Sequence, residues 1–174
     1  MSRPQPARQA LLALLTLTLL TSCEAAGTLA GGGGGSDYMA ARQALETGNY
    51  DLAIRRYGQL MQGRDAASAS RLQLEYAHAL LRANQHEQAV TAAEALIGSR
   101  DGSIRASALA VRGTARHEAA RDRLARNLAD AETRALLTGA AEDLTTFLAG
   151  HSALDSGGAM RARQQLIASD LAAL

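Results

Sequence analysis

The sequence predicts an all-α fold made of about three helical hairpins and a final capping helix. No proline occurs after Pro6, and no alternating run of β-branched residues indicates a strand. Apolar residues recur instead every three or four positions, as in Leu72, Tyr76, Ala79 and Leu80, which places them on one helix face. Glycines with Ser or Asp nearby separate the successive helical segments, as expected for helix ends and helix starts.

The composition allows a single modest domain with a core of Ala and Leu, because 47% of the 174 residues are hydrophobic and only 3% are aromatic. The formal net charge is +1, and every basic residue is an arginine. Two arginines precede residue 23, and without them the acids slightly outnumber the bases. A nucleic-acid binder normally shows a clear basic excess, so we expect no nucleic-acid partner.

The first segment, residues 1–22, reads as a secretory signal that is not part of the fold. Arg3 and Arg8 precede an apolar run over 10–20, which is shorter than the roughly 20 residues of a membrane-spanning helix. Small residues and the only cysteine, Cys23, follow this run. With one cysteine, a disulfide within the chain is impossible.

The residues around that cysteine, Leu-Thr-Ser-Cys over 20–23, resemble the lipobox of bacterial lipoproteins. The resemblance implies cleavage before Cys23, a diacylglyceryl group on its sulfur and an acylated amino terminus; the alternative is ordinary secretion with an incidental cysteine. Glu24 is not the Asp that often marks inner-membrane retention, so the resemblance implies the periplasmic face of the outer membrane. Residues 23–36 are glycine-rich and predict a flexible tether of roughly 20 Å before a helical domain over 37–174.

Two segments of this domain resemble tetratricopeptide (TPR) repeats, in which a small residue marks the first helix and the turn and second helix follow a fixed pattern. The first copy, within 44–61, has these pattern residues: Gly48, Tyr50, Ala53 and Tyr57. The second copy, within 80–97, has the following at the same places: Asn84, His86, Ala89 and Ala93. Ala41 and Ala77 are the small residues of the two first helices, and the resemblance implies close helix pairing there.

A third copy begins with Gly113 at the small position and then departs from the pattern. Its second helix is expected only at about 139–149, after an insertion of about fifteen residues. The segment 117–137 therefore either extends the first helix or contains an extra one. A final amphipathic helix over 159–171 has the pattern of a solubilising cap, so the resemblance implies a TPR-like α-solenoid.

No residue pattern indicates catalysis or a metal. Neither His-Glu pair has the second histidine four residues later that a zinc protease needs, and no nucleophile elbow or phosphate-binding glycine loop occurs. We therefore expect no enzyme activity, no metal, no small-molecule substrate and no cofactor beyond the lipid on Cys23.

In TPR arrays the first helices line a concave groove, and the resemblance implies a groove for an extended or helical peptide. Its expected residues are Tyr38, Arg42, Leu45, Leu74, His78, Leu81, Arg82, Thr114 and His117. The alternative is a self-contained bundle in which the inserted or the C-terminal helix fills this groove.

A second candidate surface is a line of arginines that would share one face if residues 105–123 form one helix, within about 20° of each other. Its members are Arg105, Arg112, Arg116 and Arg123. The line is either a basic stripe for an acidic partner or phospholipid head groups, or an ordinary solvated face.

These features favour a non-enzymatic periplasmic adaptor or scaffold, anchored by its lipid. The chain is similar to small TPR lipoproteins of Tad/Flp pilus and secretion systems and to pilotins, which implies an envelope partner such as a secretin or another assembly component. The alternative is a permanent structural accessory subunit of a large membrane machine. A periplasmic enzyme or cell-wall accessory factor would need a polar pocket with a perturbed acid or base, for which the sequence offers no candidate.

Overall fold

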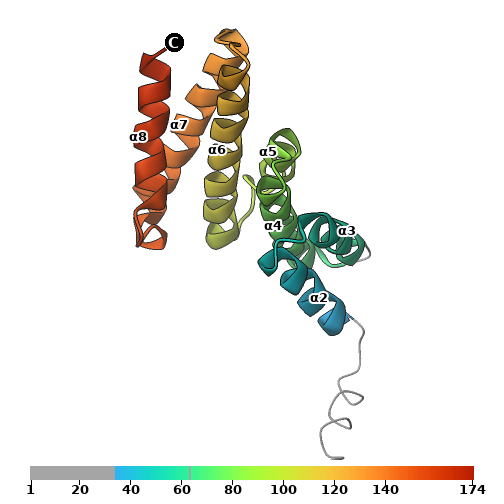
Figure 1. Ribbon diagram of the computed structural model, residues 1–174. Coiled ribbons are helices and arrows are strands. Elements are labelled where there is room, and N and C mark those ends of the chain that lie inside the picture. The colour runs from blue at the N-terminus through green and yellow to red at the C-terminus, as the bar shows by residue number, and fades with distance from the viewer. Residues whose placement is uncertain (1–33, 63) are drawn as a thin grey trace, which may run out of the picture. The chain divides into compact units, whose positions relative to one another are not determined.

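The computed structural model describes residues 34–62 and 64–174, and these residues form an all-α fold without strands (Figure 1). The chain divides into two units, Met1–Gly35 and Ser36–Leu174, and the second contains the helical fold. The expected signal peptide over 1–22, the lipidation site Cys23 and most of the expected tether lie outside the described residues. None of the described helices is long and apolar enough to cross a membrane.

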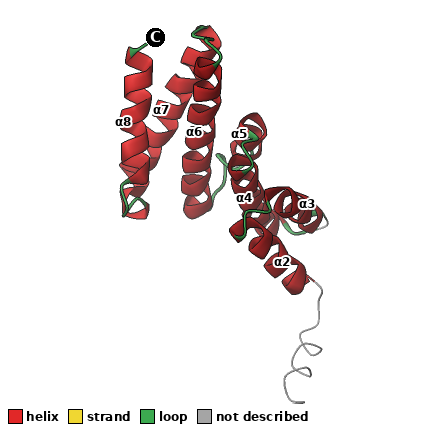
Figure 2. Cartoon of the chain, in the orientation of Figure 1, coloured by secondary structure: helices red, strands yellow, loops and turns green. Residues whose placement is uncertain are grey.

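The described part of the chain contains seven α-helices and one short 3-10 helix, joined by short loops (Figure 2). In chain order they are α2 (Gly34–Glu46), α3 (Tyr50–Met61), α4 (Ala66–Arg82), α5 (His86–Glu94), α6 (Gly102–Ala125), α7 (Ala131–His151), η1 (Ser152–Leu154) and α8 (Ala159–Ala172).

The turns that close the three hairpins α2–α3, α4–α5 and α6–α7 share one backbone feature. Each contains a residue in the left-handed region: Gly48 with φ 80°, Asn84 with φ 58° and Asn127 with φ 60°. Glycine and asparagine tolerate this conformation best, and it ends one helix so that the chain can reverse. Asn49 and Asp130 then accept backbone N–H groups at the starts of α3 and α7.

Small side chains allow the helices of each hairpin to approach closely. Ala41, Ala53, Ala77 and Ala89 are all completely buried, as expected for the residues that occupy the pattern positions of the first two hairpins. A methyl group on Gly113 of α6 would lie 3.0 Å from Cβ of Asp143 and from a methyl carbon of Leu144 in α7. Glycine at 113 therefore allows the close spacing of α6 and α7, because any larger side chain would press on Asp143 and Leu144.

The third hairpin differs from the sequence prediction. Its second helix, α7, begins at Ala131 and not near residue 139, and no extra helix lies between α6 and α7. Both helices are instead long, with 24 residues in α6 and 21 in α7. Asp130 explains the early start of α7, because its carboxylate accepts the backbone N–H of Thr133 and contacts the guanidinium of Arg123 at 2.8 Å.

From α3 onward each helix packs against the next helix in chain order, and α6 also contacts both α4 and α8. Arg42 of α2 contacts Glu75 of α4 at 2.9 Å, which brings α2 beside the same set. Each even-numbered helix is therefore a neighbour of the next one, in the order α2, α4, α6 and α8. The expected groove residues lie on the first three of them.

Candidate binding groove

An apolar groove of about 570 Å³ lies between α4, α6, the end of α7 and the segment that leads into α8. Most of its lining is apolar: Leu74, Ala110, Val111, Phe147, Leu154, Ala159 and Met160. The other lining residues are Glu75, His78, Ser107, Asp155 and Gly157. The groove has the size and the mainly apolar lining of typical ligand sites in proteins.

The periodicity of α4 and α6 explains how the groove is built. Leu74 and His78 are four residues apart on α4, so both side chains point to the same side of that helix. Ser107 and Val111 have the same spacing on α6 and form the facing wall. Leu154, which is 61% exposed, forms part of the rim and leaves apolar surface open to a partner.

Asp155 lines the groove but is only 6% exposed, and its carboxylate is engaged by the start of α8. Its carboxylate accepts the backbone N–H groups of Met160 at 2.9 Å and Arg161 at 3.1 Å. These bonds give partners to two backbone N–H groups in the first turn of α8. The N-cap residue of this helix, Gly158, has no side chain that could accept them. Asp155 thus positions Met160 in the groove wall.

His78 is the titratable group of the groove that makes no hydrogen bond among the described residues. It is exposed, yet it sits in a concave surface, and the surrounding protein withdraws enough water to lower its pKa below the ordinary value. Glu75, Arg82 and Arg42 are the charged groups that act on it, and Glu75 is already paired with Arg42.

The other expected groove residues of α2 and α4 lie outside this groove. Leu45 is buried in a core cluster that includes Tyr57 and Leu72. Tyr38 contacts the ring of Tyr57 edge to face, with 6.4 Å between ring centroids. Leu81 is half-buried and packs against a second core cluster, which includes Leu80 and Ala115. Arg82 lies over the ring of Tyr50, with its Cζ 5.4 Å from the centroid and a 2.8 Å hydrogen bond to the hydroxyl.

The two expected groove residues of α6 lie in its interface with α8. His117 is completely buried, with Nε2 2.9 Å from Oδ2 of Asp170 and Nδ1 3.0 Å from Nη1 of Arg163. A guanidinium only donates, so Nδ1 accepts and Nε2–H donates to Asp170. The hydroxyl of Thr114 lies 3.9 Å from the sulfur of Met160. The sequence could not place these residues, because α8 follows them by more than forty positions.

The arginine line of α6 forms internal contacts and not a free basic stripe. Arg112 and Arg116 both contact the carboxylate of Asp143, which is 3% exposed, and both reach Glu94 of α5. Arg123 contacts Asp130 and Glu132 at the start of α7. Arg105 remains exposed and donates to the carbonyl of Ser99 at 2.9 Å. The side chain of Arg112 is only 11% exposed, so this face is largely covered.

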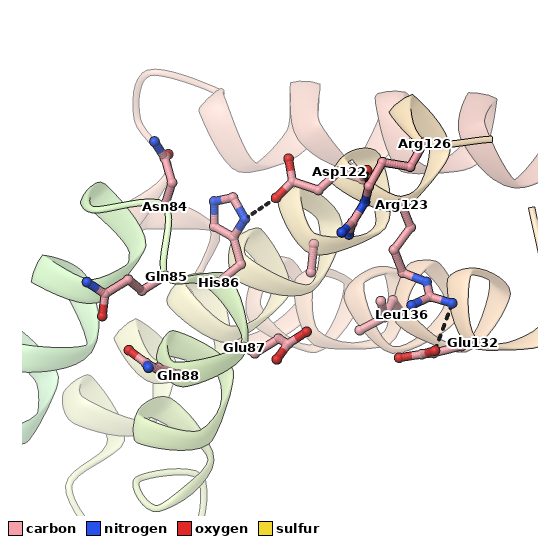
Figure 3. A pocket seen from close by; sticks show the side chains of 11 residues that line it. Asn84, Gln85, His86, Glu87, Gln88, Asp122, Arg123, Arg126, Glu132 and Leu136 are labelled. Atoms are coloured by element: carbon pink, nitrogen blue, oxygen red, sulfur yellow. Dashed lines mark hydrogen bonds and ion pairs between the residues drawn. The ribbon is translucent and has the colours of Figure 1, made fainter. Parts of the chain in front are cut away.

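A second cavity of about 320 Å³ lies where the start of α5 meets the end of α6 and the start of α7 (Figure 3). In it His86, 8% exposed, contacts Asp122 at 2.8 Å between Nδ1 and Oδ2. Figure 3 shows Arg123 turned toward Glu132 on the opposite side, at 2.7 Å. No Ser, Thr, Cys or Lys lines this cavity, so the His–Asp pair has no nucleophile to activate.

Within residues 34–62 and 64–174, no three His, Cys, Asp or Glu side chains are grouped to hold a metal ion. Comparisons with family models, with curated proteins and with solved structures find no match for this chain. The function is therefore argued from the geometry of the groove and from the sequence.

Proposed function

We propose that this chain is a non-enzymatic, lipid-anchored adaptor of the bacterial periplasm, whose TPR-like hairpins bind a segment of an envelope protein. The observation on which the proposal depends is the open apolar groove of about 570 Å³ between α4 and α6. A groove of this kind, formed by side chains on rigid helices, suits an extended or helical peptide better than a chemical reaction.

Two features support a TPR-like arrangement. Gly48 and Asn84 have the same left-handed conformation in equivalent turns, and Ala53 and Ala89 are both completely buried in the helices that follow. Helix α6 contacts both α4 and α8, as the first helices of successive stacked hairpins do. The third hairpin is a longer variant, and α8 closes the array.

Lipid anchoring is supported by the sequence around Cys23, behind a short apolar run with two preceding arginines. Two or three acyl chains give stable membrane attachment, whereas one chain gives only marginal binding. Intact-mass spectrometry of the chain purified from bacterial membranes tests this part. We expect loss of residues 1–22 and addition of lipid mass at Cys23; an unmodified cysteine would contradict it.

The alternative role of permanent accessory subunit predicts a continuous apolar surface on the isolated chain. The large apolar side chains that are exposed in the described residues lie in four separate segments: Met39 in α2, Leu128 between α6 and α7, Leu154 in η1 and Leu166 in α8. Their distribution over separate segments of the chain is the observation that favours the adaptor role over permanent burial in a machine.

Site-specific photocrosslinking in cells that produce the protein tests the adaptor role. A photoreactive amino acid at Ser107, in the groove wall, is expected to capture one envelope protein. The matched control places it at Gln59, which is exposed on α3 and does not line the groove. Equal capture from both positions, or no capture from Ser107, would refute a role of the groove in partner binding.

A further inference from the structure

The helices α4, α6 and α8 run in the same direction, so their first turns lie at one end of the array. Near the start of α4, Leu74 packs against the cluster that contains Ile104 of α6, and farther along, Leu80 shares a cluster with Ala115. Figure 1 shows that α6 and α8, which are in contact, both run toward the end at which the C-terminus lies. The other end of the array is therefore formed by three helix starts.

Five exposed arginines lie at this end and form what we call the arginine edge: Arg64 and Arg71 at α4, Arg100 and Arg105 at α6, and Arg161 at α8. Among the described residues none of the five pairs with a carboxylate, whereas Arg112 and Arg163, farther along α6 and α8, do. The side chains of Arg64 and Arg105 donate only to backbone carbonyls. The guanidinium groups of the edge are therefore open to a negative partner.

Three of the four aspartates at this end serve as helix caps. Asp65 and Asp101 accept backbone N–H groups in the first turns of α4 and α6, and Asp155 does the same for α8. Asp37 lies in the first turn of α2. The partial positive charge of a helix start opposes the charge of the aspartate that caps it, so the arginines supply the exposed charge that remains.

The position of these arginines is not explained by the stability of the helices. Arg105 and Arg161 stand at helix starts, where the helix dipole disfavours a cation. At the opposite end of the array, α3, α5 and α7 begin with the acids that the dipole favours: Asp51, Glu87 and Glu132. Side chains that break a local rule without an internal partner indicate a function outside the fold.

The chain that leads to Cys23 leaves the array at the same end. Arg82 at the end of α4 bonds to Tyr50 at the start of α3, so these two helices are antiparallel, and the turn at Gly48 reverses the chain between α2 and α3. Helix α2 therefore starts beside the starts of α4 and α6. Cys23 precedes Gly34 by eleven positions, which span at most about 40 Å. A membrane that holds a lipid on Cys23 is thus within reach of the arginine edge.

We propose that the arginine edge rests on a lipid surface, where its guanidinium groups bind the phosphates of anionic lipid head groups. A guanidinium donates in a planar fork that matches phosphate oxygens. Each cation near an anionic membrane surface strengthens attachment roughly fivefold. The helices then stand on the membrane, and the first turns of α3, α5 and α7 point away from it. This inference rests on the proposed lipid anchor and adds the orientation of the anchored chain.

Fluorescence quenching in vesicles tests this orientation with the mature, full-length chain held by its own lipid. A fluorophore is attached through Ser68→Cys on the arginine edge or through Gln88→Cys at the opposite end, both at exposed positions. The lipid head groups carry the quencher. In vesicles that contain phosphatidylglycerol we expect stronger quenching at position 68 than at 88. We expect this excess to vanish in vesicles of phosphatidylcholine alone.

Salt and arginine substitutions test the electrostatic cause. Raising the ionic strength from about 0.1 to 1 M shortens the Debye length from about 10 to 3 Å and should remove the excess quenching. The variant R71Q/R100Q should weaken the contact roughly 30-fold, so the excess is lost at a lower salt concentration than in the parent. The matched control R55Q/R134Q removes two exposed arginines outside the edge and should keep the salt dependence of the parent. Circular dichroism compares the helix content of both variants.

The outcomes separate this inference from the proposed function. Equal quenching at both positions with phosphatidylglycerol, as for an edge that binds an acidic protein instead, would overturn the inference. An excess that persists in phosphatidylcholine, or an unchanged salt dependence in R71Q/R100Q, would also overturn it. Lipid mass at Cys23 and capture from Ser107 judge the anchor and the adaptor role independently.

If mass spectrometry finds no lipid on Cys23, the proposed anchor fails and flotation with the same vesicles tests the edge alone. The purified chain should then float with phosphatidylglycerol vesicles, and R71Q/R100Q should float less than R55Q/R134Q. Absence of flotation, or equal flotation of the two variants, would overturn the role of the arginine edge.

Discussion

The substitution Asp143→Ala removes the buried carboxylate that joins α7 to α6. Asp143 is 3% exposed and contacts both Arg112, whose side chain is 11% exposed, and Arg116, which is 23% exposed. Removing one partner of a buried ion pair costs about 3–5 kcal/mol, because it leaves an uncompensated charge. Glu94 still contacts both guanidinium groups and stays as a partial replacement. We therefore expect the lower end of this range, a loss of about 3 kcal/mol in the free energy of unfolding.

Urea unfolding followed by far-ultraviolet circular dichroism measures this loss. The neighbouring substitution Glu142→Ala is the matched control: its carboxylate is exposed and forms no ion pair among the described residues, so we expect a change within about 0.5 kcal/mol. In a double-mutant cycle, Asp143→Ala and Arg112→Ala should be coupled by more than about 1 kcal/mol. A loss below about 1 kcal/mol for Asp143→Ala, or additive single effects, would refute the assigned role of this ion-pair cluster.

Three further predictions concern packing and pH. Gly113→Ala should cost about 1–2 kcal/mol, because its new methyl group meets α7 at 3.0 Å, whereas Gly58→Ala, with no atom within 4 Å, should stabilise α3; equal effects in thermal unfolding would contradict this. The pKa of Asp130 is lowered from 3.8 to about 2 by the Thr133 backbone N–H and by Arg123, so its stabilising effect is present above pH 3.8 and is lost as pH falls toward 2. Asp130→Asn should therefore flatten the fall of the melting temperature between pH 4 and 2, and parallel profiles would count against it. Ile167→Ala should cost about 3 kcal/mol and accelerate amide hydrogen exchange in α8 before α3 and α4; unchanged protection of α8 would show that Ile167 does not hold it.

Local signals in the sequence predicted the elements of the fold better than their contacts. Gly48 and Asn84 marked two hairpin turns, because few residue types accept the left-handed conformation found there. The final helix, expected over 159–171, is observed as Ala159–Ala172. The predicted start of α7, near residue 139, was wrong. The helix begins at Ala131 because Asp130 caps it, and the side chain of Asp130 is held by a contact with Arg123.

The candidate site was less predictable, because it depends on contacts between residues far apart in the chain. Leu74 and His78 line the groove as expected. Phe147 of α7 and Met160 of α8 complete it, and no local sequence pattern predicted these two residues. The arginines of α6 shared a face as expected, yet their partner Asp143 follows Arg112 by 31 positions. Helical periodicity shows which residues share a face but not which element covers that face.

Neighbour-to-neighbour packing of the helices has a consequence for how unfolding is observed. The four tyrosines lie at positions 38, 50, 57 and 76, all within α2 to α4, while the helices from α5 onward contain only Phe147 as an aromatic ring apart from histidine. Tyrosine fluorescence therefore reports on one end of the array and circular dichroism on all of it. Because contacts run mainly between successive helices, the two ends can lose structure separately. A tyrosine signal that stays unchanged while Asp143→Ala shifts the dichroism curve would reveal an array that melts from one end.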